Sequence, residues 1–194
     1  MVNEGKFSDD GNQTTPELFC ILNNKKTQSV QFFIENADIN VSGHTDSISY
    51  AKVTGSPSQD EYKNFNNGLN KIAVGFIPFQ SALNSARKFN NKDLIEINKK
   101  KIDSVRIVYY KFISDHITAH PASAVTVEII MDNHFGLKPE ELESWLGKLD
   151  PSMKNTEKVE TLYNILKIMK RVAIGQPAQD FIQKYWDSEL AGLS

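Results

Sequence analysis

The spacing of apolar residues changes once along the chain, close to residue 56. Before that point, short apolar runs rich in β-branched and aromatic side chains are separated by polar turns. Two of these runs alternate apolar and polar positions, a period of two that is typical of half-buried strands. The expected strands are 17–22, 30–34, 39–43 and 48–55. They predict a small antiparallel sheet, forming a partial sandwich, at the N-terminus.

After residue 56, apolar side chains recur every three or four residues, as on one face of an amphipathic helix. Ser58 and Glu61 have the spacing of a capping box, which predicts a helix that begins at Ser58. Pro78 is expected to kink or divide this helix, because proline has no N–H to give to the preceding turn. Further helices are expected over 93–117, after Pro121 with that proline in the first turn, from residue 139, and over 156–172.

The predicted fold class is therefore α+β, with a small antiparallel β-sheet followed by an antiparallel array of about five helices. We expect a β domain over residues 1–55, a helical domain packed on it over 56–174, and a separate C-terminal segment over 175–194.

Composition narrows the classes of function. The 194 residues are 40% hydrophobic and 24% charged, as in ordinary globular proteins. The net charge of -2, with lysine and arginine dispersed along the chain, argues against a nucleic-acid partner. No apolar run reaches the length of about 18 residues that a membrane span needs. The first residues show no signal peptide, which indicates a cytoplasmic protein if the chain is complete.

Cys20 is the only cysteine. A single thiol cannot form an intramolecular disulfide or the Cys-x-x-Cys pair of thiol exchange, because exchange needs a second thiol to resolve the mixed disulfide. Cys20 lies within the apolar run 18–22, so we expect a buried, unreactive side chain.

His116 and His120 are four residues apart, which places both imidazoles on one helical face where they could ligate zinc. No glutamate general base lies between them, however, and no third ligand is evident. The alternative is a pair of solvated or capping histidines at a helix end, which suits the negative end of the helix dipole. His44 and His134 are isolated in turns, and residues 99–101 are interpreted as a solvated lysine face. No catalytic, cofactor-binding or metal-binding residue is predicted.

A cleft between the sheet and the helices would suit a small apolar or peptide ligand. The aromatic residues that could line it also recur at the spacing of helix core positions, so core packing competes with this interpretation. These residues are Phe76, Phe79, Tyr109, Tyr110 and Trp145.

Several phrases, taken in order, resemble the accessory region that precedes the thioredoxin-like domain in exported bacterial thiol-disulfide exchange proteins of the TlpA/ResA type. The phrases are GKF (5–7), FFIENADINVSG (32–43), VTGSPSQDEYKNF (53–65), FISDHITAHPASAV (112–125), the stretch 139–162, and VAIGQPAQDF (172–181). The last phrase resembles the entrance to the thioredoxin-like domain, with Gln179 where that family usually has proline.

The resemblance implies a periplasmic or cell-envelope protein. In that family a Trp-Cys-x-x-Cys helix start follows the entrance phrase, whereas no cysteine follows Phe181 here. It therefore implies a non-catalytic binding or scaffold module that positions a redox domain or mediates dimer or partner contacts, and no enzyme activity or cofactor. Only four residues precede GKF, which implies an incomplete sheet whose edge a second copy could cover to give a homodimer. The alternative is a ligand- or peptide-binding protein, or an enzyme, with its site in the cleft.

Overall fold

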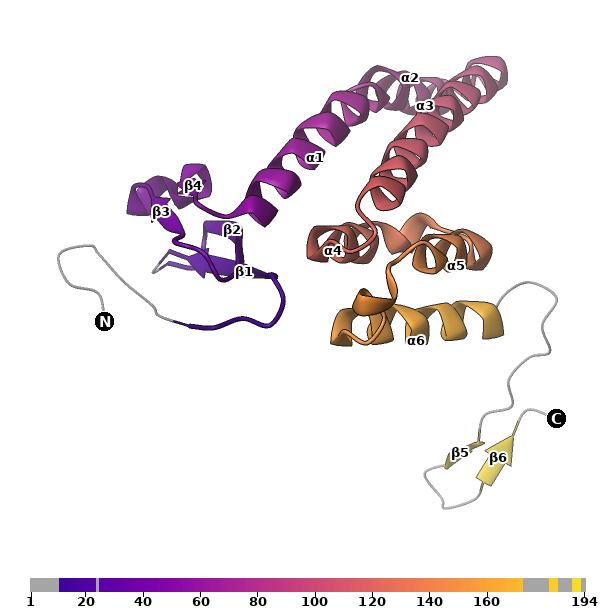
Figure 1. Cartoon of the computed structure of the whole chain (residues 1–194). Coiled ribbons are helices and arrows are strands. Elements are labelled where there is room, and N and C mark those ends of the chain that lie inside the picture. Colours follow the sequence, from indigo (N-terminus) through magenta and orange to yellow (C-terminus); the bar gives the residue numbers. More distant parts are fainter. Residues whose placement is uncertain (1–10, 24, 173–181, 185–189, 193–194) are drawn as a thin grey trace.

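The structure, a computed structural model, describes residues 11–23 and 25–172 and two short strands at Ile182–Lys184 and Leu190–Gly192. Strands occupy the N-terminal part, helix α1 leads away from them, and the later helices follow, with two further short strands after the last helix (Figure 1). The architecture is α+β, as the sequence predicts. Among the described residues, no helix is both long and apolar enough to cross a membrane.

The N-terminal strands form two separate antiparallel hairpins, whereas the sequence predicts one sheet. The strands are β1 (Glu17–Leu22), β2 (Ser29–Ile34), β3 (Asn40–Ser42) and β4 (Lys52–Thr54). Leu18 lies opposite Phe33 in the first hairpin. The expected strand over 48–55 is wrong in its first half, because the 3-10 segment η1 (Thr45–Tyr50) turns the chain there. The backbone N–H of Asp46 donates to His44 Nδ1 at 3.3 Å, which stabilises that turn.

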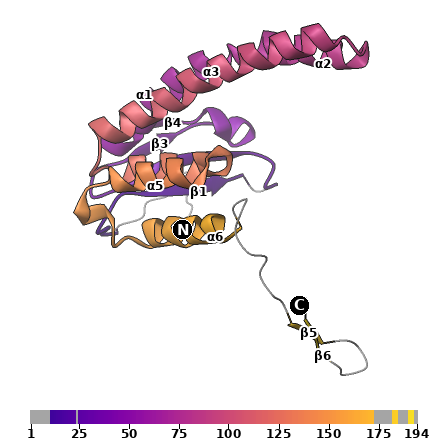
Figure 2. The ribbon, with the colours of Figure 1, turned by 90° about the vertical axis from the view of Figure 1, so that its right-hand side faces the viewer.

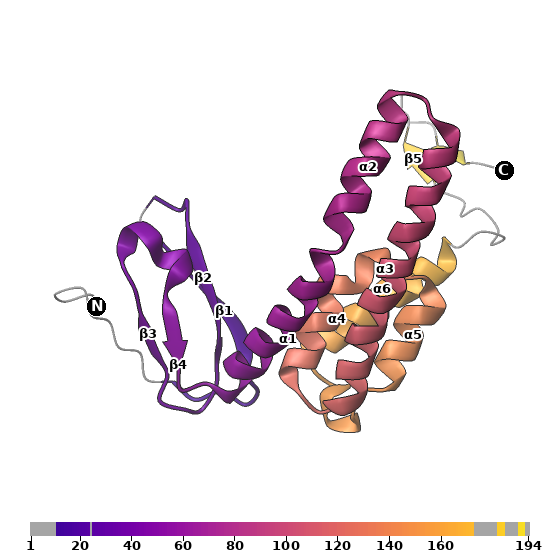
Figure 3. The ribbon, with the colours of Figure 1, turned by 90° about the horizontal axis from the view of Figure 1, so that it is seen from above.

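The helical part contains six α-helices and two 3-10 segments within the described residues. The helices are α1 (Pro57–Ala73), α2 (Phe76–Lys88), α3 (Lys92–Ala119), α4 (Ala124–Asn133), α5 (Pro139–Gly147) and α6 (Glu157–Arg171), with η2 (His134–Gly136) and η3 (Pro151–Met153) between them. Helices α1 and α3 lie above α4 and α5, and α6 lies below these (Figures 1 and 2). The hairpin of α2 and α3 extends beyond the other helices (Figure 3).

The first helix begins earlier than predicted. Ser56 is its N-cap, with the hydroxyl Oγ accepting the N–H of Gln59 at 3.0 Å, and Pro57 occupies the first helical position that proline favours. The Ser58 hydroxyl donates instead to Glu35 Oε2 at 3.0 Å. The capping box predicted for Ser58 and Glu61 is therefore wrong, and both side chains are left for contacts outside the helix.

Pro78 does accompany a division of the helix, as predicted. α1 ends at Ala73 and α2 begins at Phe76, so Pro78 lies in the first turn of α2, where no N–H is required. The prediction for Pro121 is wrong: Ser123 is the N-cap of α4, and Pro121 precedes the helix in the connecting turn. The starts of α3, α5 and α6 agree with prediction to within one residue.

Among the described residues, one hydrophobic cluster joins strand β2 to the helices. Phe33 of β2 is 1% exposed and packs edge-on against Tyr62 of α1, with ring centroids 5.4 Å apart. Other fully buried core residues come from the helices; they include Ile113, Ile117, Val125, Ile130, Leu142, Leu146, Val159 and Leu162. Phe33 is thus the residue through which strand β2 joins the core of the helices.

Helices α1 and α3 approach each other closely at Gly68. A Cβ built on this glycine would lie 2.5 Å from Cζ of Phe112, closer than side chains tolerate. The absence of a side chain at Gly68 therefore leaves room for the Phe112 ring of α3 against α1, and these two helices carry most of the residues described below.

The expected burial of Cys20 is wrong, because its side chain is exposed. Leu18 and Cys20 share one face of β1, but only Leu18 packs against the core. Cys20 lies opposite Gln31, which is also exposed. The core thus covers one end of this strand face and leaves the other end open.

The entrance phrase over 172–181 lies outside the described residues except for Val172, which follows α6. The GKF phrase over 5–7 lies outside them as well. Within the predicted segment 175–194, β5 (Ile182–Lys184) and β6 (Leu190–Gly192) pair in antiparallel fashion.

Candidate functional site

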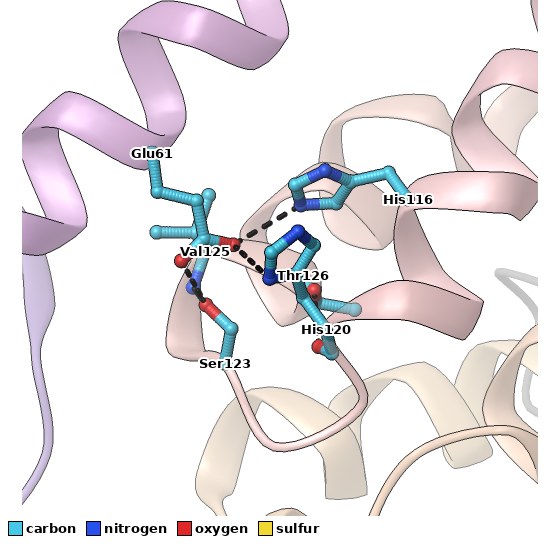
Figure 4. Close-up of polar contacts among 6 residues, drawn as sticks. All are labelled: Glu61, His116, His120, Ser123, Val125 and Thr126. Carbon is cyan, nitrogen blue, oxygen red and sulfur yellow. Dashed lines mark hydrogen bonds and ion pairs between the residues drawn. The ribbon is translucent and has the colours of Figure 1, made fainter.

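Four polar side chains from three helices meet where α1 passes the corner between α3 and α4 (Figure 4). Glu61 lies in the second turn of α1. His116 lies in the last turn of α3, and His120 is the C-cap of that helix. Ser123 is the N-cap of α4. We call these four residues the corner cluster.

The Glu61 carboxylate is the centre of the corner cluster. Its Oε1 accepts from His116 Nε2 at 3.1 Å, and its Oε2 accepts from the Ser123 hydroxyl at 2.9 Å. His120 Nδ1 is 4.0 Å from Oε1, which is an ionic contact rather than a hydrogen bond. These contacts tie α1 to the α3–α4 corner across more than fifty residues of sequence.

Burial alone would raise the pKa of the Glu61 carboxyl. Hydrogen bonds from His116 and Ser123, with smaller contributions from the charges of His116 and His120, outweigh that effect and hold the pKa below its usual value. Glu61 is therefore ionised at neutral pH. Because an ionised carboxylate only accepts hydrogen bonds, His116 Nε2 must carry a proton and donate it.

The two histidines differ in exposure. The His116 side chain is only 12% exposed and packs against Phe65, whereas about half of the His120 side chain is exposed. Their rings stack with centroids 4.6 Å apart. His116 is thus not the solvated or capping residue that the sequence suggests, because it donates to a carboxylate from another helix.

The stacked rings do not converge on a metal position with other ligands. In the part of the chain that the structure describes, no group of three histidine, cysteine, aspartate or glutamate side chains could hold a metal ion. His134 is buried with Nδ1 2.6 Å from the carbonyl oxygen of Met131, and His44 is exposed at the start of η1.

The bonding pattern does not match a hydrolase triad. There, the nucleophilic hydroxyl donates to an imidazole, which in turn donates to a carboxylate. In the corner cluster, Ser123 and His116 both donate to the same carboxylate, so no imidazole accepts the proton of the hydroxyl. Ser123 Oγ also accepts the N–H of Val125 at 3.1 Å, which is an N-cap contact. These contacts position helices and leave Ser123 without a general base.

An open pocket of about 510 Å³ adjoins the corner cluster, which we call the junction pocket. It lies between the segment that leads into β1 and the α3–α4 corner, and Glu61, His120 and Ser123 form part of its wall. The remaining lining residues are small, apolar or hydroxylic: Thr15, Pro16, Ser58, Ala119, Pro121, Ala122, Ala124 and Met153.

Four of the five aromatic residues expected to line a cleft pack against one another instead. Ring contacts run from Phe76 to Tyr109, then to Tyr110, and then to Trp145, with centroid distances of 6.1, 5.6 and 6.0 Å. Phe79 contacts the Lys101 ammonium, whose nitrogen is 5.4 Å from the ring centroid. None of the five lines the junction pocket or a second pocket of about 390 Å³ between the hairpins and α1.

Sequence reasoning missed Glu61 and Ser123 as members of this site. One signal was present: Glu61 precedes the buried Phe65 by four residues, so a carboxylate lies on the core-facing stripe of α1. A charge at such a position needs a partner, although the sequence does not reveal which one.

A family model described as a domain of unknown function (DUF4369) matches residues 1–62. The match covers the N-terminal strands and ends inside α1, one residue beyond Glu61. Searches of curated proteins and of solved structures found no significant match.

Proposed function

We propose that the chain is a non-catalytic binding module whose junction pocket holds a peptide segment of a protein partner. The observation that carries the proposal is the Glu61 carboxylate, ionised and partly open to a pocket at the meeting point of the β1 lead-in, α1 and the α3–α4 corner. Clefts with mainly apolar walls and a few fixed polar groups are the usual form of ligand sites.

The resemblance to TlpA/ResA-type proteins supplies a setting for this module. In that setting it would reside in the periplasm or cell envelope and position a redox domain or hold its partner. The exposed Cys20 is the only thiol in the chain, which supports a role without thiol-disulfide exchange.

Peptide selection against the chain tests the proposal. Peptides selected on the wild-type protein should lose at least tenfold in affinity when Ala122→Trp fills the junction pocket. Ala122 is exposed at the pocket wall, so this change should leave the core intact. Asn67→Trp, at an exposed position of α1 that lines neither pocket, is the matched control. Equal binding to the Ala122→Trp and control variants would remove the proposal.

Insulin reduction with dithiothreitol tests the absence of catalysis. The wild type and Cys20→Ser should both leave the uncatalysed rate unchanged. Turnover that depends on Cys20 would show that the protein is an exchange enzyme.

A second candidate function is self-association through β1. In the described residues, β1 pairs with β2 on one side and has no strand partner on the other, and Phe19, Cys20 and Leu22 are exposed. An unpaired apolar edge is a template for another strand, and β1 contains no lysine or proline that would block pairing. Light scattering should give a dimer mass that Phe19→Lys reduces to the monomer. A monomeric wild type at high concentration would contradict this candidate.

A further inference from the structure

The Glu61 carboxylate has acceptor positions that the corner cluster does not use. An ionised carboxylate offers about four lone-pair positions. His116 uses one on Oε1 and Ser123 uses one on Oε2, while His120 is too far away for a hydrogen bond. The Glu61 side chain is 24% exposed and lines the junction pocket, so a bound molecule can reach the remaining positions.

The charges around the pocket favour a cation. Among the described residues, the lining contains no lysine or arginine, its one carboxylate is Glu61, and its one imidazole is that of His120. The C-terminal carbonyl groups of α3 carry partial negative charge, and that helix ends at Ala119 in the pocket wall.

Two helix N-termini near the pocket would instead favour an anion, but a donor at each already has a side-chain partner. At the start of α1, Glu35 Oε1 accepts the N–H of Ser58 at 2.9 Å. At the start of α4, Ser123 Oγ accepts the N–H of Val125. The attraction of these helix ends for a further anion is therefore reduced, and the open carboxylate determines the charge preference.

The apolar wall suits an alkyl stem. Pro16, Ala119, Pro121, Ala122 and Met153 present small or unbranched apolar groups beside Glu61. Lysine and arginine side chains combine such a stem with a cationic head, and the arginine head can donate to both carboxylate oxygens at once.

We infer that the junction pocket binds a cationic side chain, a lysine ammonium or an arginine guanidinium, whose head donates to Glu61 and whose stem lies against the apolar wall. This inference rests on the proposed function, because it names the group of the partner peptide that the pocket selects. Ammonium and guanidinium share the chemistry that the site recognises, and the experiment separates them.

The test titrates the whole chain, followed by NMR, with the N-acetyl amides of arginine and lysine and with N-acetylcitrulline amide. Citrulline has the shape of arginine without its charge. We expect saturable shifts at the backbone amides of Glu61, His120 and Ser123 with arginine or lysine, and at least tenfold weaker binding of citrulline. Glu61→Gln, once shown by circular dichroism to fold, should lose binding by a similar factor.

A second pair of variants tests the same inference even where Glu61→Gln does not fold. Ala122→Arg places a guanidinium on the exposed pocket wall, where it can donate to the Glu61 carboxylate in place of a ligand. Ala122→Gln is its neutral control. We expect Ala122→Arg to abolish binding and Ala122→Gln to retain it.

The outcomes separate the two proposals. Citrulline binding as tightly as arginine, or unchanged binding by Glu61→Gln, would overturn the preference for a cation. If the peptides from the selection still lost affinity with Ala122→Trp, the proposed function would stand. If none of the three amides shifted those signals and no selected peptide was sensitive to Ala122→Trp, both proposals would fall.

Discussion

Replacing Glu61 with alanine removes the acceptor of two hydrogen bonds at once. His116 Nε2 and the Ser123 hydroxyl both lose an ionised partner, and the His116 side chain is only 12% exposed. A hydrogen bond to a charged group contributes about 1.5–3 kcal/mol. Since Glu61 is 24% exposed and water can replace part of what is lost, we expect about 2 kcal/mol from the His116 contact. Ser123 keeps its N-cap contact and should add less than about 1 kcal/mol.

Glu61→Ala should therefore lower the free energy of unfolding by about 2–3 kcal/mol. For a chain of this size, that corresponds to a fall in Tm of roughly 4–12 °C. Urea unfolding followed by circular dichroism at the helix band measures the free energy, and a thermal scan measures Tm.

Two variants separate the contacts from other effects of the substitution. Glu61→Gln keeps an acceptor oxygen and the shape of the side chain, so it should cost only about 1 kcal/mol. Lys63→Ala, an exposed neighbour on the same helix, should change stability by less than about 0.5 kcal/mol.

The effect of Glu61→Ala should also depend on pH. Because the folded-state pKa of Glu61 lies below its ordinary value of 4.5, the ionised carboxylate stabilises the fold above pH 4.5, and this contribution is lost as pH falls through the folded-state pKa. The difference in free energy of unfolding between the wild type and Glu61→Ala should therefore become smaller below pH 4.5. A loss under about 0.5 kcal/mol at neutral pH, or a gap that stays constant on acidification, would refute our account of the corner cluster.

Three further predictions concern other parts of the fold. Gly68→Ala should destabilise the protein by about 1–3 kcal/mol in urea unfolding because its methyl group would overlap a ring of α3, whereas Gly147→Ala, which meets nothing within 4 Å, should be near neutral; equal effects would contradict the close helix approach. Cys20 should react with a water-soluble maleimide in the folded protein, and labelling that requires denaturant would show that it is buried. Burial, and then the charge of Glu128, raise the pKa of Asp132, so the ionised Asp132 carboxylate disfavours folding. Asp132→Asn should therefore raise the free energy of unfolding at pH 7, and this gain should disappear on acidification. No gain at pH 7 would contradict the cause assigned to the shift.

Residue spacing predicts the order of elements well and their ends less well. The apolar stripe through Phe65 and Leu69 predicts α1 because helix periodicity is local. The N-cap is Ser56 and not the predicted Ser58, because the Ser58 hydroxyl donates to Glu35, which follows β2. A contact of that kind depends on the folded chain and does not follow from a motif of four residues.

The site was harder to predict than the fold. His116 and His120 are identifiable from their spacing, but Glu61 lies 55 residues before its nearest imidazole partner. The error at Cys20 has a similar origin, because an apolar run reveals that a strand faces a core without revealing how far the core extends along it.

The insertion of Phe33 among the helices has a consequence for cooperativity. Two-stranded hairpins are marginal alone in water, so the N-terminal hairpins depend on Phe33 being covered by α1 and the residues behind it. A fragment ending at residue 62, where the family match stops, would lack Phe65, Leu69 and every later core residue. Amide protons of β2 in the whole protein should then exchange with deuterium in the same opening event as those of α1, because the two elements melt together as one foldon.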